Sequence, residues 1–237
     1  MRVVELWRFP VKSLQGERVP AVEIGPAGLL GDRSHAIFDV ATGLGLTARR
    51  VPEMLFASAR HLDGGGVEIT LPDGSVAADD AALSAWLGRP VQLRSADDLG
   101  PRNYENPSDT ETESDDSWHP FEGSSGAFHD SAGATVTVLS RPNTGGEDPR
   151  RFRANVLVDA GEDDLVGSSV RVGRAVLAVL KPVGRCVLVT RAQPDGIAVD
   201  REVLRRIHRE RGGNLAVGGT VTTTGAVAVG DDLTVVV

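Results

Sequence analysis

The chain has 237 residues, of which 41% are hydrophobic and 24% charged, a composition typical of a soluble globular protein with one large domain or two small ones. A formal net charge of −8 argues against broad binding to nucleic acid or to an anionic membrane. A single cysteine excludes an internal disulfide framework and a zinc site built from several cysteines. No apolar run approaches the length of a membrane span, and the N-terminus lacks the apolar core of a signal peptide, so we expect a cytoplasmic protein.

The first part of the chain is expected to be rich in short strands. Apolar runs bounded by glycine-rich turns predict strands over residues 3–9, 19–24, 34–40, 67–71 and 91–94. One helix is expected, because Asp79 or Asp80 can cap a helix that runs to about Leu87 and stops at Gly88. We therefore predict a strand-rich N-terminal domain over residues 1–95.

Residues 96–127 interrupt this pattern. The stretch 97–116 within them is acidic and almost free of apolar side chains. Such a stretch cannot bury enough apolar surface to offset the entropy lost on ordering, so an acidic flexible linker or loop is predicted. The alternative is a lid over a site, which the aromatic residues Trp118, Phe121 and Phe128 suggest.

Strand patterning resumes in the second half of the chain. The expected strands cover residues 136–139, 155–158, 169–172 and 175–180, with a strand, turn and strand over 221–237. A helix is expected from Asp200 to about Arg211, with an apolar face, an arginine-rich solvated face and Gly212 as its stop. The expected fold class is thus mostly β (α+β), with the N-terminal domain packed on a C-terminal β-barrel over residues 128–237.

The only cysteine, Cys186, lies in a stretch that also contains an arginine and one of the two lysines, and this is the stretch richest in potentially reactive groups. Apolar runs at 176–180 and 187–189 predict two strands separated by a proline and a glycine, so Cys186 is expected where a loop re-enters a sheet. Arg185 beside it and Lys181 nearby would favour the thiolate, which attacks electrophiles or binds a soft metal. The alternative is a small buried hydrophobe, which is what a lone cysteine most often is.

Further cations lie in loops elsewhere in the chain. They are Lys12 with Ser13, Arg33 after Asp32, Arg49, and Arg153 with Asn155. Several cations near one thiol would suit a phosphorylated, electron-rich ligand, although their spacing cannot show that they converge. The sequence contains no P-loop, HExxH or GxSxG motif, which argues against common nucleotide-fold enzymes and zinc hydrolases.

These residues belong to a series of motifs that spans most of the chain. In order, the motifs are Phe9-Pro10-Val11-Lys12-Ser13 with Gly16, Gly28-Leu29-Leu30-Gly31-Asp32-Arg33, Leu46-Thr47-Ala48-Arg49, Phe128-His129-Asp130, Arg151-Phe152-Arg153-Ala154-Asn155-Val156-Leu157-Val158, Lys181-Pro182-Val183-Gly184-Arg185-Cys186, and Gly225 to Gly230-Asp231. The series resembles the MOSC family, named for molybdenum-cofactor sulfurases, in the subgroup with an N-terminal β-barrel domain. That subgroup includes the amidoxime-reducing components.

The resemblance implies a molybdenum cofactor (molybdopterin) whose metal is ligated by Cys186, which would also be the catalytic residue. It implies that the pterin and its phosphate are bound by motif residues of both halves, the first half contributing from residues 1–50. These cofactor-binding residues are Lys12, Ser13, Arg33, Arg49, Arg153, Asn155, Lys181 and Arg185. Asp130 and Asn155 are expected to shape the site instead of reacting. The family is also associated with pyridoxal phosphate binding.

The activity implied by the resemblance is the two-electron reduction of small N-hydroxylated compounds such as hydroxylamines and amidoximes. Some relatives carry a fused ferredoxin domain with its own cysteines, which this chain lacks, so an external ferredoxin- or flavoprotein-type donor is expected. Ala154 also stands where relatives often have a proline. Two alternatives remain open: a sulfurtransferase, sulfur carrier or cofactor carrier with a persulfide on Cys186, and a non-catalytic binding module with an inert Cys186.

Overall fold

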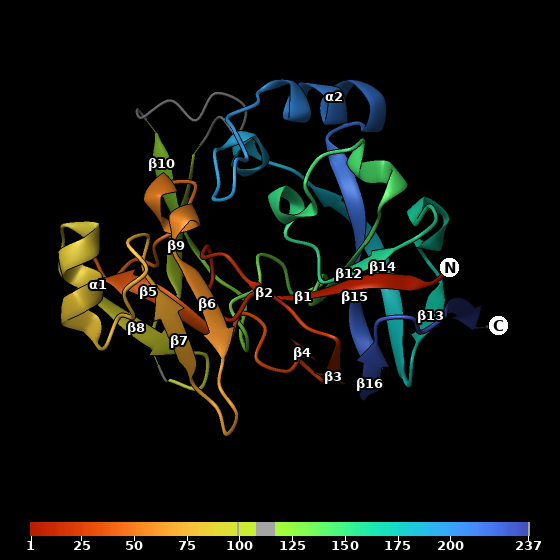
Figure 1. The fold of residues 1–237 in the computed structure, drawn as a ribbon, viewed down its shortest axis with the longest axis horizontal. Helices are drawn as coiled ribbons and strands as arrows, with labels where there is room; N and C mark the ends of the chain where they lie inside the picture. Colours follow the sequence, from red (N-terminus) through yellow and green to blue (C-terminus); the bar gives the residue numbers. More distant parts are fainter. Residues whose placement is uncertain (99, 108–116, 237) are drawn as a thin grey trace.

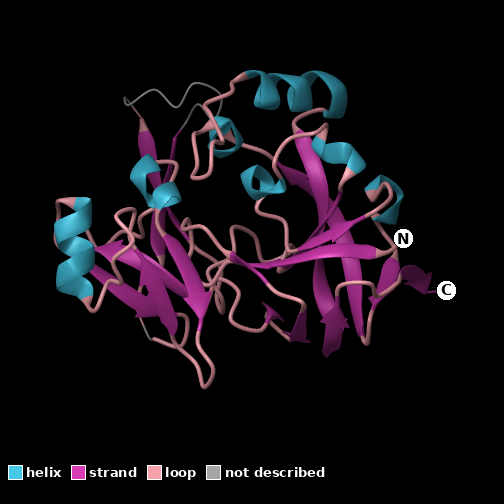
Figure 2. Cartoon of the chain, in the orientation of Figure 1, coloured by secondary structure: helices cyan, strands magenta, loops and turns pink. Residues whose placement is uncertain are grey.

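The computed structural model describes residues 1–98, 100–107 and 117–236. The described part of the chain is built mainly of strands and contains two α-helices, α1 (Asp80–Leu87) and α2 (Glu202–Arg211) (Figures 1 and 2). This confirms the mostly β fold class expected from the sequence. Among the residues described, none of the helices has the length and apolar character required to cross a membrane.

An eight-stranded sheet dominates the right-hand side of Figure 1, in the order β17-β13-β14-β15-β11-β12-β1-β2. Its strands are β1 (Val3–Arg8), β2 (Glu17–Arg18), β11 (Val136–Ser140), β12 (Val156–Val158), β13 (Ser169–Val172), β14 (Ala175–Gly184), β15 (Asn214–Thr223) and β17 (Leu233–Val236). β11 and β12 run parallel, and the other neighbours are antiparallel. Apolar side chains of these strands, among them Val138, Val170 and Leu177, form one buried core.

The first strand of the chain belongs to this C-terminal sheet. β1 pairs with β12 and not with the strands of residues 30–95. A smaller sheet of β3 (Ala21–Gly25), β4 (Gly28–Leu29) and β16 (Gly225–Ala228) likewise joins the start of the chain to its end. The sheets therefore do not follow a border at residue 95, and the loop that carries Lys12 leaves directly from the C-terminal sheet.

The other strands form a second body on the left of Figure 1. It contains β5 (His35–Asp39) paired with β8 (Val91–Ser95), β6 (Ser58–His61) paired with β7 (Val67–Thr70), the 3-10 helix η1 (Pro52–Phe56) and α1. Val11 and Leu14, from the loop after β1, are fully buried in the core of this body. That loop therefore connects the two bodies, because it starts in one sheet and packs into the core of the other.

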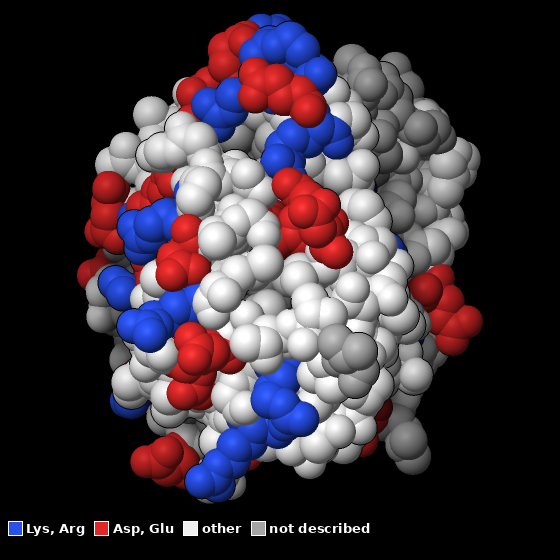
Figure 3. Space-filling view, turned by 90° about the vertical axis from the view of Figure 1, so that its right-hand side faces the viewer, with Lys and Arg blue, Asp and Glu red and all other residues white. Residues whose placement is uncertain are grey.

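Both α-helices lie where local capping signals predict them. The Asp79 side chain accepts an N–H in the first turn of α1, and Gly88 ends the helix in the left-handed conformation (φ 64°). In α2 the first N–H donates to the Asp200 side chain (2.8 Å), and Gly212 ends the helix in the same way. The arginine-rich side of α2 is exposed, and acidic side chains are mixed with the basic ones at the top of Figure 3.

Part of the segment 96–127 is folded. β9 (Asn103–Pro107) pairs with β10 (Trp118–Glu122), and the Tyr104 side chain is buried between Phe38 and Phe121, with ring centroids 5.8 and 5.9 Å away. The expectation of a flexible linker is corrected for these residues, because the ring of Tyr104 supplies buried surface that the acidic residues lack. The most acidic residues, 108–116, and residue 99 lie outside the described part of the chain.

The backbone around Cys186 also differs from the prediction. β14 does not end at residue 180 but continues to Gly184, with breaks in its register against β15 near Pro182, which has no N–H for the ladder. Residues 187–189 were expected as a strand, but they begin a 3-10 turn, η5 (Val187–Thr190). The N–H of Val189 closes this turn on the Cys186 carbonyl (3.2 Å). A short apolar run satisfies either structure, so periodicity alone could not distinguish them.

Candidate functional site

The loop after β1 places Lys12 between the two bodies. Its backbone N–H donates to the carbonyl of His35 (2.9 Å), and its side chain is largely buried. The ammonium donates to the Phe128 carbonyl (3.1 Å), forms an ion pair with Asp130, and lies 5.1 Å from the ring centroid of Tyr104. Lys12 holds the pKa of Asp130 well below its usual range, so this carboxylate stays ionised.

Arg33 and Arg153 come together around the ring of Phe9. Their guanidinium carbons lie 5.2 Å and 4.4 Å from the ring centroid. Arg33 forms an ion pair with its neighbour Asp32 and donates to the carbonyl of Arg153 (3.2 Å). Asp32 also accepts the N–H of Phe9 (2.7 Å), so the same carboxylate fixes both the cation and the aromatic ring below it.

Three of the predicted binding residues have left-handed backbones. The φ angles are 71° at Ser13, 50° at Arg33 and 52° at Arg153. Residues other than glycine rarely adopt this conformation, and such strain persists only where the surrounding structure enforces it. The same backbone conformation thus occurs in three separate loops. In each loop it occurs at a residue that the motif series predicts to bind the cofactor.

Arg153 is held in place by a backbone acceptor. Its Nη1 donates to the carbonyl of Leu14 (2.6 Å), in the loop that carries Lys12. Burial, and then the nearby charge of Arg33, lower the pKa of Arg153 from its ordinary value to about 9. The guanidinium is therefore in an unfavourable environment that a bound anion would relieve.

Arg185 has the same character. Its Nε donates to the Leu215 carbonyl (2.8 Å) and its Nη1 to the Phe152 carbonyl (2.7 Å). Its Nη2 is buried and has no hydrogen-bond partner among the described residues. Burial lowers the pKa of Arg185 to about 10. The electrostatic interaction with neighbouring Cys186 is the largest effect that acts to raise it. Cys186 itself is partly buried at the start of η5.

Lys12, Arg33, Arg153 and Arg185 thus converge from loops of both halves. Asp130 and Asp32 compensate the charges of Lys12 and Arg33, whereas the acceptors of Arg153 and Arg185 in the described residues are backbone carbonyls. Electrostatic coupling links Arg185 to Arg33, and Arg153 to Arg33 as well. The cluster has an excess of positive charge that is largely or partly shielded from solvent, and an anionic group is the partner that would stabilise it.

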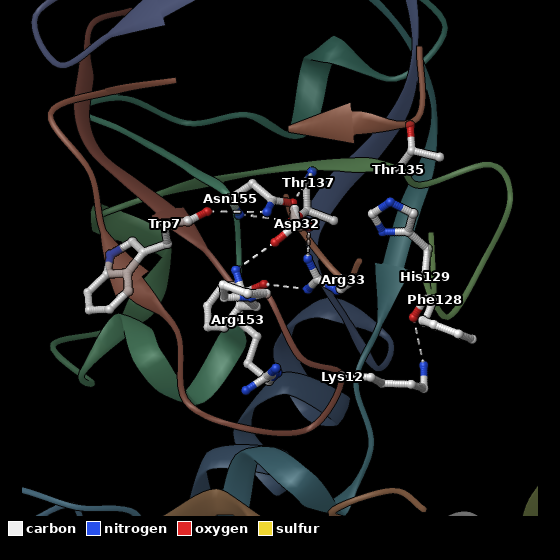
Figure 4. A network of polar contacts seen from close by, with 12 residues as sticks. Trp7, Lys12, Asp32, Arg33, Phe128, His129, Thr135, Thr137, Arg153 and Asn155 are labelled. Atoms are coloured by element: carbon white, nitrogen blue, oxygen red, sulfur yellow. Dashed lines mark hydrogen bonds and ion pairs between the residues drawn. The ribbon is translucent and has the colours of Figure 1, made fainter. Parts of the chain in front are cut away.

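Asn155 lies beside this cluster, but its side chain is already engaged. It is fully buried, and its Oδ1 accepts from the N–H and the hydroxyl of Thr137 (3.2 and 3.1 Å). Its Nδ2 donates to the carbonyl of Trp7 (3.3 Å), at the end of β1 (Figure 4). Asn155 therefore links β1 and β11 directly before β12, and these bonds leave it little capacity for a ligand. Its role in shaping the site stays a prediction.

Two other predicted binding residues lie further out. Lys181 is exposed, and its ammonium donates to the hydroxyl of Ser131 (2.7 Å), next to Asp130. Arg49 donates to the side chain of Asn106 (2.9 Å), and its carbonyl accepts from Arg191 (2.9 Å). No contact of either residue with the four converging cations is observed in the described part of the chain.

Sequence reasoning missed two residues of the site. The sequence indicates Phe9 only as one member of a motif, although its ring lies against two guanidinium groups. Tyr104, the only tyrosine in the chain, lay in the segment expected to be flexible. Its hydroxyl is buried without a partner among the described residues, and burial raises its pKa. Together with Trp118 and Phe121, this tyrosine was an available sign that part of the segment packs.

The buried ring of His129 makes the protein sensitive to acid. Its Nε2 lies 2.9 Å from the Ala27 carbonyl, and burial, followed by the charge of Arg33, lowers its pKa from 6.5. The unfolded chain therefore takes up a proton at a higher pH than the folded protein, so stability is lost as the pH falls below 6.5 towards the lowered pKa.

Urea unfolding across this range should show a flatter pH dependence of the unfolding free energy for His129→Gln than for the parent. His208→Gln, on the exposed side of α2, should keep the parent slope, and an unchanged slope in His129→Gln would contradict this assignment.

Comparisons with known proteins agree with the motif series. The family model described as the MOSC N-terminal beta barrel domain matches residues 1–106, and the model described as the MOSC domain matches residues 133–234. None of the curated proteins compared with the chain is significantly similar. Among solved structures, the YuaD protein from Bacillus subtilis is 12% identical with a TM-score of 0.44, over 98% of this chain and 93% of its own. YiiM from Geobacillus stearothermophilus is 17% identical with a TM-score of 0.35, over 44% of this chain and 55% of its own. Because the two family models together match most of its residues, the chain belongs to the MOSC family, whose domains are associated with molybdenum-cofactor binding.

Proposed function

We propose that this protein is a molybdenum-cofactor oxidoreductase that reduces small N-hydroxylated compounds. The observation that carries the proposal is the group of largely buried or partly buried cations near Cys186, in which Arg153 and Arg185 have only backbone carbonyls as acceptors within the described residues. Such a group suits an anionic, electron-rich ligand, and the adjacent thiol suits a soft metal. Membership of the MOSC family supports this particular ligand.

The residues present fit the cofactor. Lys12, Arg33 and Arg153 would hold the phosphate and the pterin, and the unpartnered Nη2 of Arg185 offers a further donor. Cys186 would ligate the metal through its thiolate, which metal binding keeps deprotonated. When bound, the cofactor supplies the two-electron chemistry that converts N–OH to N–H and water with two electrons and two protons.

The protein's own contribution is positioning and exclusion of water. Phe9 is 1% exposed and closes the site beneath Arg33 and Arg153, so their charges act in a region from which solvent is excluded on that side. Asp130 would orient Lys12 but not supply a proton, because Lys12 holds its pKa well below its usual range. The left-handed backbones of Ser13 and Arg153 indicate that surrounding contacts, such as the bond from Arg153 to the Leu14 carbonyl, hold the binding loops in one arrangement before the ligand arrives.

Electrons would come from a separate donor of the ferredoxin or flavoprotein type. The chain has one cysteine, whereas a ferredoxin cluster takes about four thiolate ligands. In this proposal Cys186 is used by the molybdenum site.

The test is the molybdenum and pterin content of protein purified from cells that make the cofactor, followed by reaction with a hydroxylamine or an amidoxime and a chemical reductant. We expect near-stoichiometric metal and pterin, and formation of the amine or amidine in step with consumption of the reductant. Stoichiometric cofactor without reduction of either substrate would contradict the proposed activity. Absence of metal, together with sulfur released from Cys186 by cyanide, would favour the alternative of a sulfur carrier with a Cys186 persulfide.

A further inference from the structure

Two arginines cross between the turn that carries Cys186 and a second turn, η3 (Pro149–Phe152). Arg185, just before Cys186, donates to the carbonyl of Phe152 in η3 (2.7 Å). In the opposite direction, Arg151 of η3 donates through Nη1 to the carbonyl of Val189 in η5 (3.2 Å). Each turn therefore supplies a guanidinium to the backbone of the other, one on each side of Cys186.

Arg151 also binds the chain beyond η5. Its Nη1 also donates to the carbonyl of Arg191 (3.3 Å), and its Nη2 donates to the carbonyl of Ala198 (2.8 Å). One guanidinium thus joins three carbonyls of the chain that follows Cys186. The Arg151 side chain is 6% exposed and its bond to Val189 is buried, so losing that bond would leave a buried acceptor without a partner.

The other edge of the same guanidinium is fixed by Glu147. The Nε of Arg151 donates to the Glu147 carboxylate (3.1 Å), which also lies 3.6 Å from the Nη2 of Arg206 in α2. The plane of the guanidinium is therefore set from two sides. A lysine here could keep the ion pair, but a single ammonium cannot reproduce the planar fork that reaches three carbonyls.

Apolar contacts complete the support of the turn. Val189 is buried with Phe152 and Ile207 in the core beneath α2. Leu188, its neighbour, packs instead against the core of the N-terminal body. The turn that begins at Cys186 is thus held by both bodies, and Arg151 fixes its carbonyl side.

We propose that Arg151 is a positioning residue that sets the orientation of the Cys186 thiol, next to Arg185, by fixing the backbone of η5 and of residues 191–198. Arg151 donates neither to Cys186 nor to Lys12, Arg33 or Arg153, and it acts through the carbonyls that it binds. The role of this orientation in holding a metal rests on the proposed function, whereas the orientation of the thiol does not.

The test compares Arg151→Lys with Arg150→Lys in the cofactor-free protein. Arg150 is a matched control, because it belongs to the same turn but pairs with the carboxylates of Asp148 and Asp195 and not with the carbonyls after Cys186. The reaction of Cys186 with iodoacetamide should be about tenfold faster in Arg151→Lys than in the parent, the factor expected for the loss of about one net hydrogen bond. Arg150→Lys should react at the parent rate.

Unfolding in urea, measured on the same samples, separates positioning from general destabilisation. Glu147→Gln is a milder variant that leaves every carbonyl bond of Arg151 in place, and it should accelerate alkylation about threefold by loosening one edge of the guanidinium. If Arg151→Lys does not fold, the Glu147→Gln rate decides. Parent-like rates in the folded Arg151 and Glu147 variants, or equal acceleration in Arg150→Lys, would overturn the proposal.

Cofactor-loaded protein provides an independent readout. The electron paramagnetic resonance spectrum of the partly reduced protein should be homogeneous in the parent and in Arg150→Lys, but heterogeneous in Arg151→Lys at equal pterin content. A parent without metal would refute the proposed function and leave the alkylation result valid. A parent with metal and an unchanged spectrum in Arg151→Lys would refute the positioning role alone.

Discussion

Replacing Cys186 with alanine is expected to reduce the molybdenum content of the purified protein by more than about a hundredfold, because the variant loses the only thiolate that the chain can offer to the metal. Cys186 is partly buried and is not part of the apolar cores, so the fold should remain. Elemental analysis of parent and variant from the same cofactor-producing host measures this effect. The urea midpoint should shift little.

Two controls make this result specific. Cys186→Ser keeps the size of the side chain but not the soft sulfur, so it should lose the metal as the alanine variant does. Pterin measured in the same samples shows whether the cations still retain the organic part without the metal bond. Molybdenum at the parent level in both variants would exclude Cys186 as the ligand.

Replacing Arg153 with methionine should have opposite effects on stability and on binding. The lowered pKa of Arg153, about 9, means that the folded protein stabilises this charge poorly. Removing it should therefore stabilise the cofactor-free protein by about 1–3 kcal/mol, despite the lost bond to Leu14. Retention of the pterin should fall about a hundredfold, because a charge-assisted bond to the ligand is lost. Thermal unfolding without cofactor and pterin content after gel filtration measure the two effects.

Arg150→Met provides the contrast. Arg150 lies in η3, the turn that Arg153 follows, but its guanidinium is paired with two carboxylates, and these pairs raise its pKa. Its removal should destabilise the protein slightly and leave the pterin content unchanged. A loss of stability in Arg153→Met equal to that in Arg150→Met would show that the cations of the site are not held in the unfavourable state described above.

The helices and most strands follow from local chemistry, and they could be predicted for that reason. Asp79 and Gly88 define α1 through hydrogen bonds and backbone conformations within a few residues. The turn after Cys186 could not be predicted in this way, because Val189 and Leu188 pack into two different cores that are distant in the sequence. A run of three apolar residues does not indicate which core each side chain will pack into.

In the candidate site, too, some features could be predicted from the sequence and others could not. Motif order identified Lys12, Arg33, Arg153 and Arg185 as candidates, and the structure brings them together. The ring of Phe9 between two guanidinium groups depends on loops that are far apart in the chain, so spacing could not reveal it. Lys181 and Arg49 belong to the same series of motifs, but Lys181 donates to Ser131 and Arg49 donates to Asn106, and neither bond reaches one of the four cations. Motif order therefore does not show which members converge.

The pairing of β1 with β12 has a consequence for the order of events during synthesis. The first strand leaves the ribosome long before its partner strand exists, so its apolar residues remain without a sheet while the N-terminal body has all of its own strands available. Lys12 lies only a few residues after β1, and its loop can take its final position only once β1 is in place. A cofactor bound by Lys12 together with Cys186 is therefore expected to enter only after the second half of the site has been synthesised.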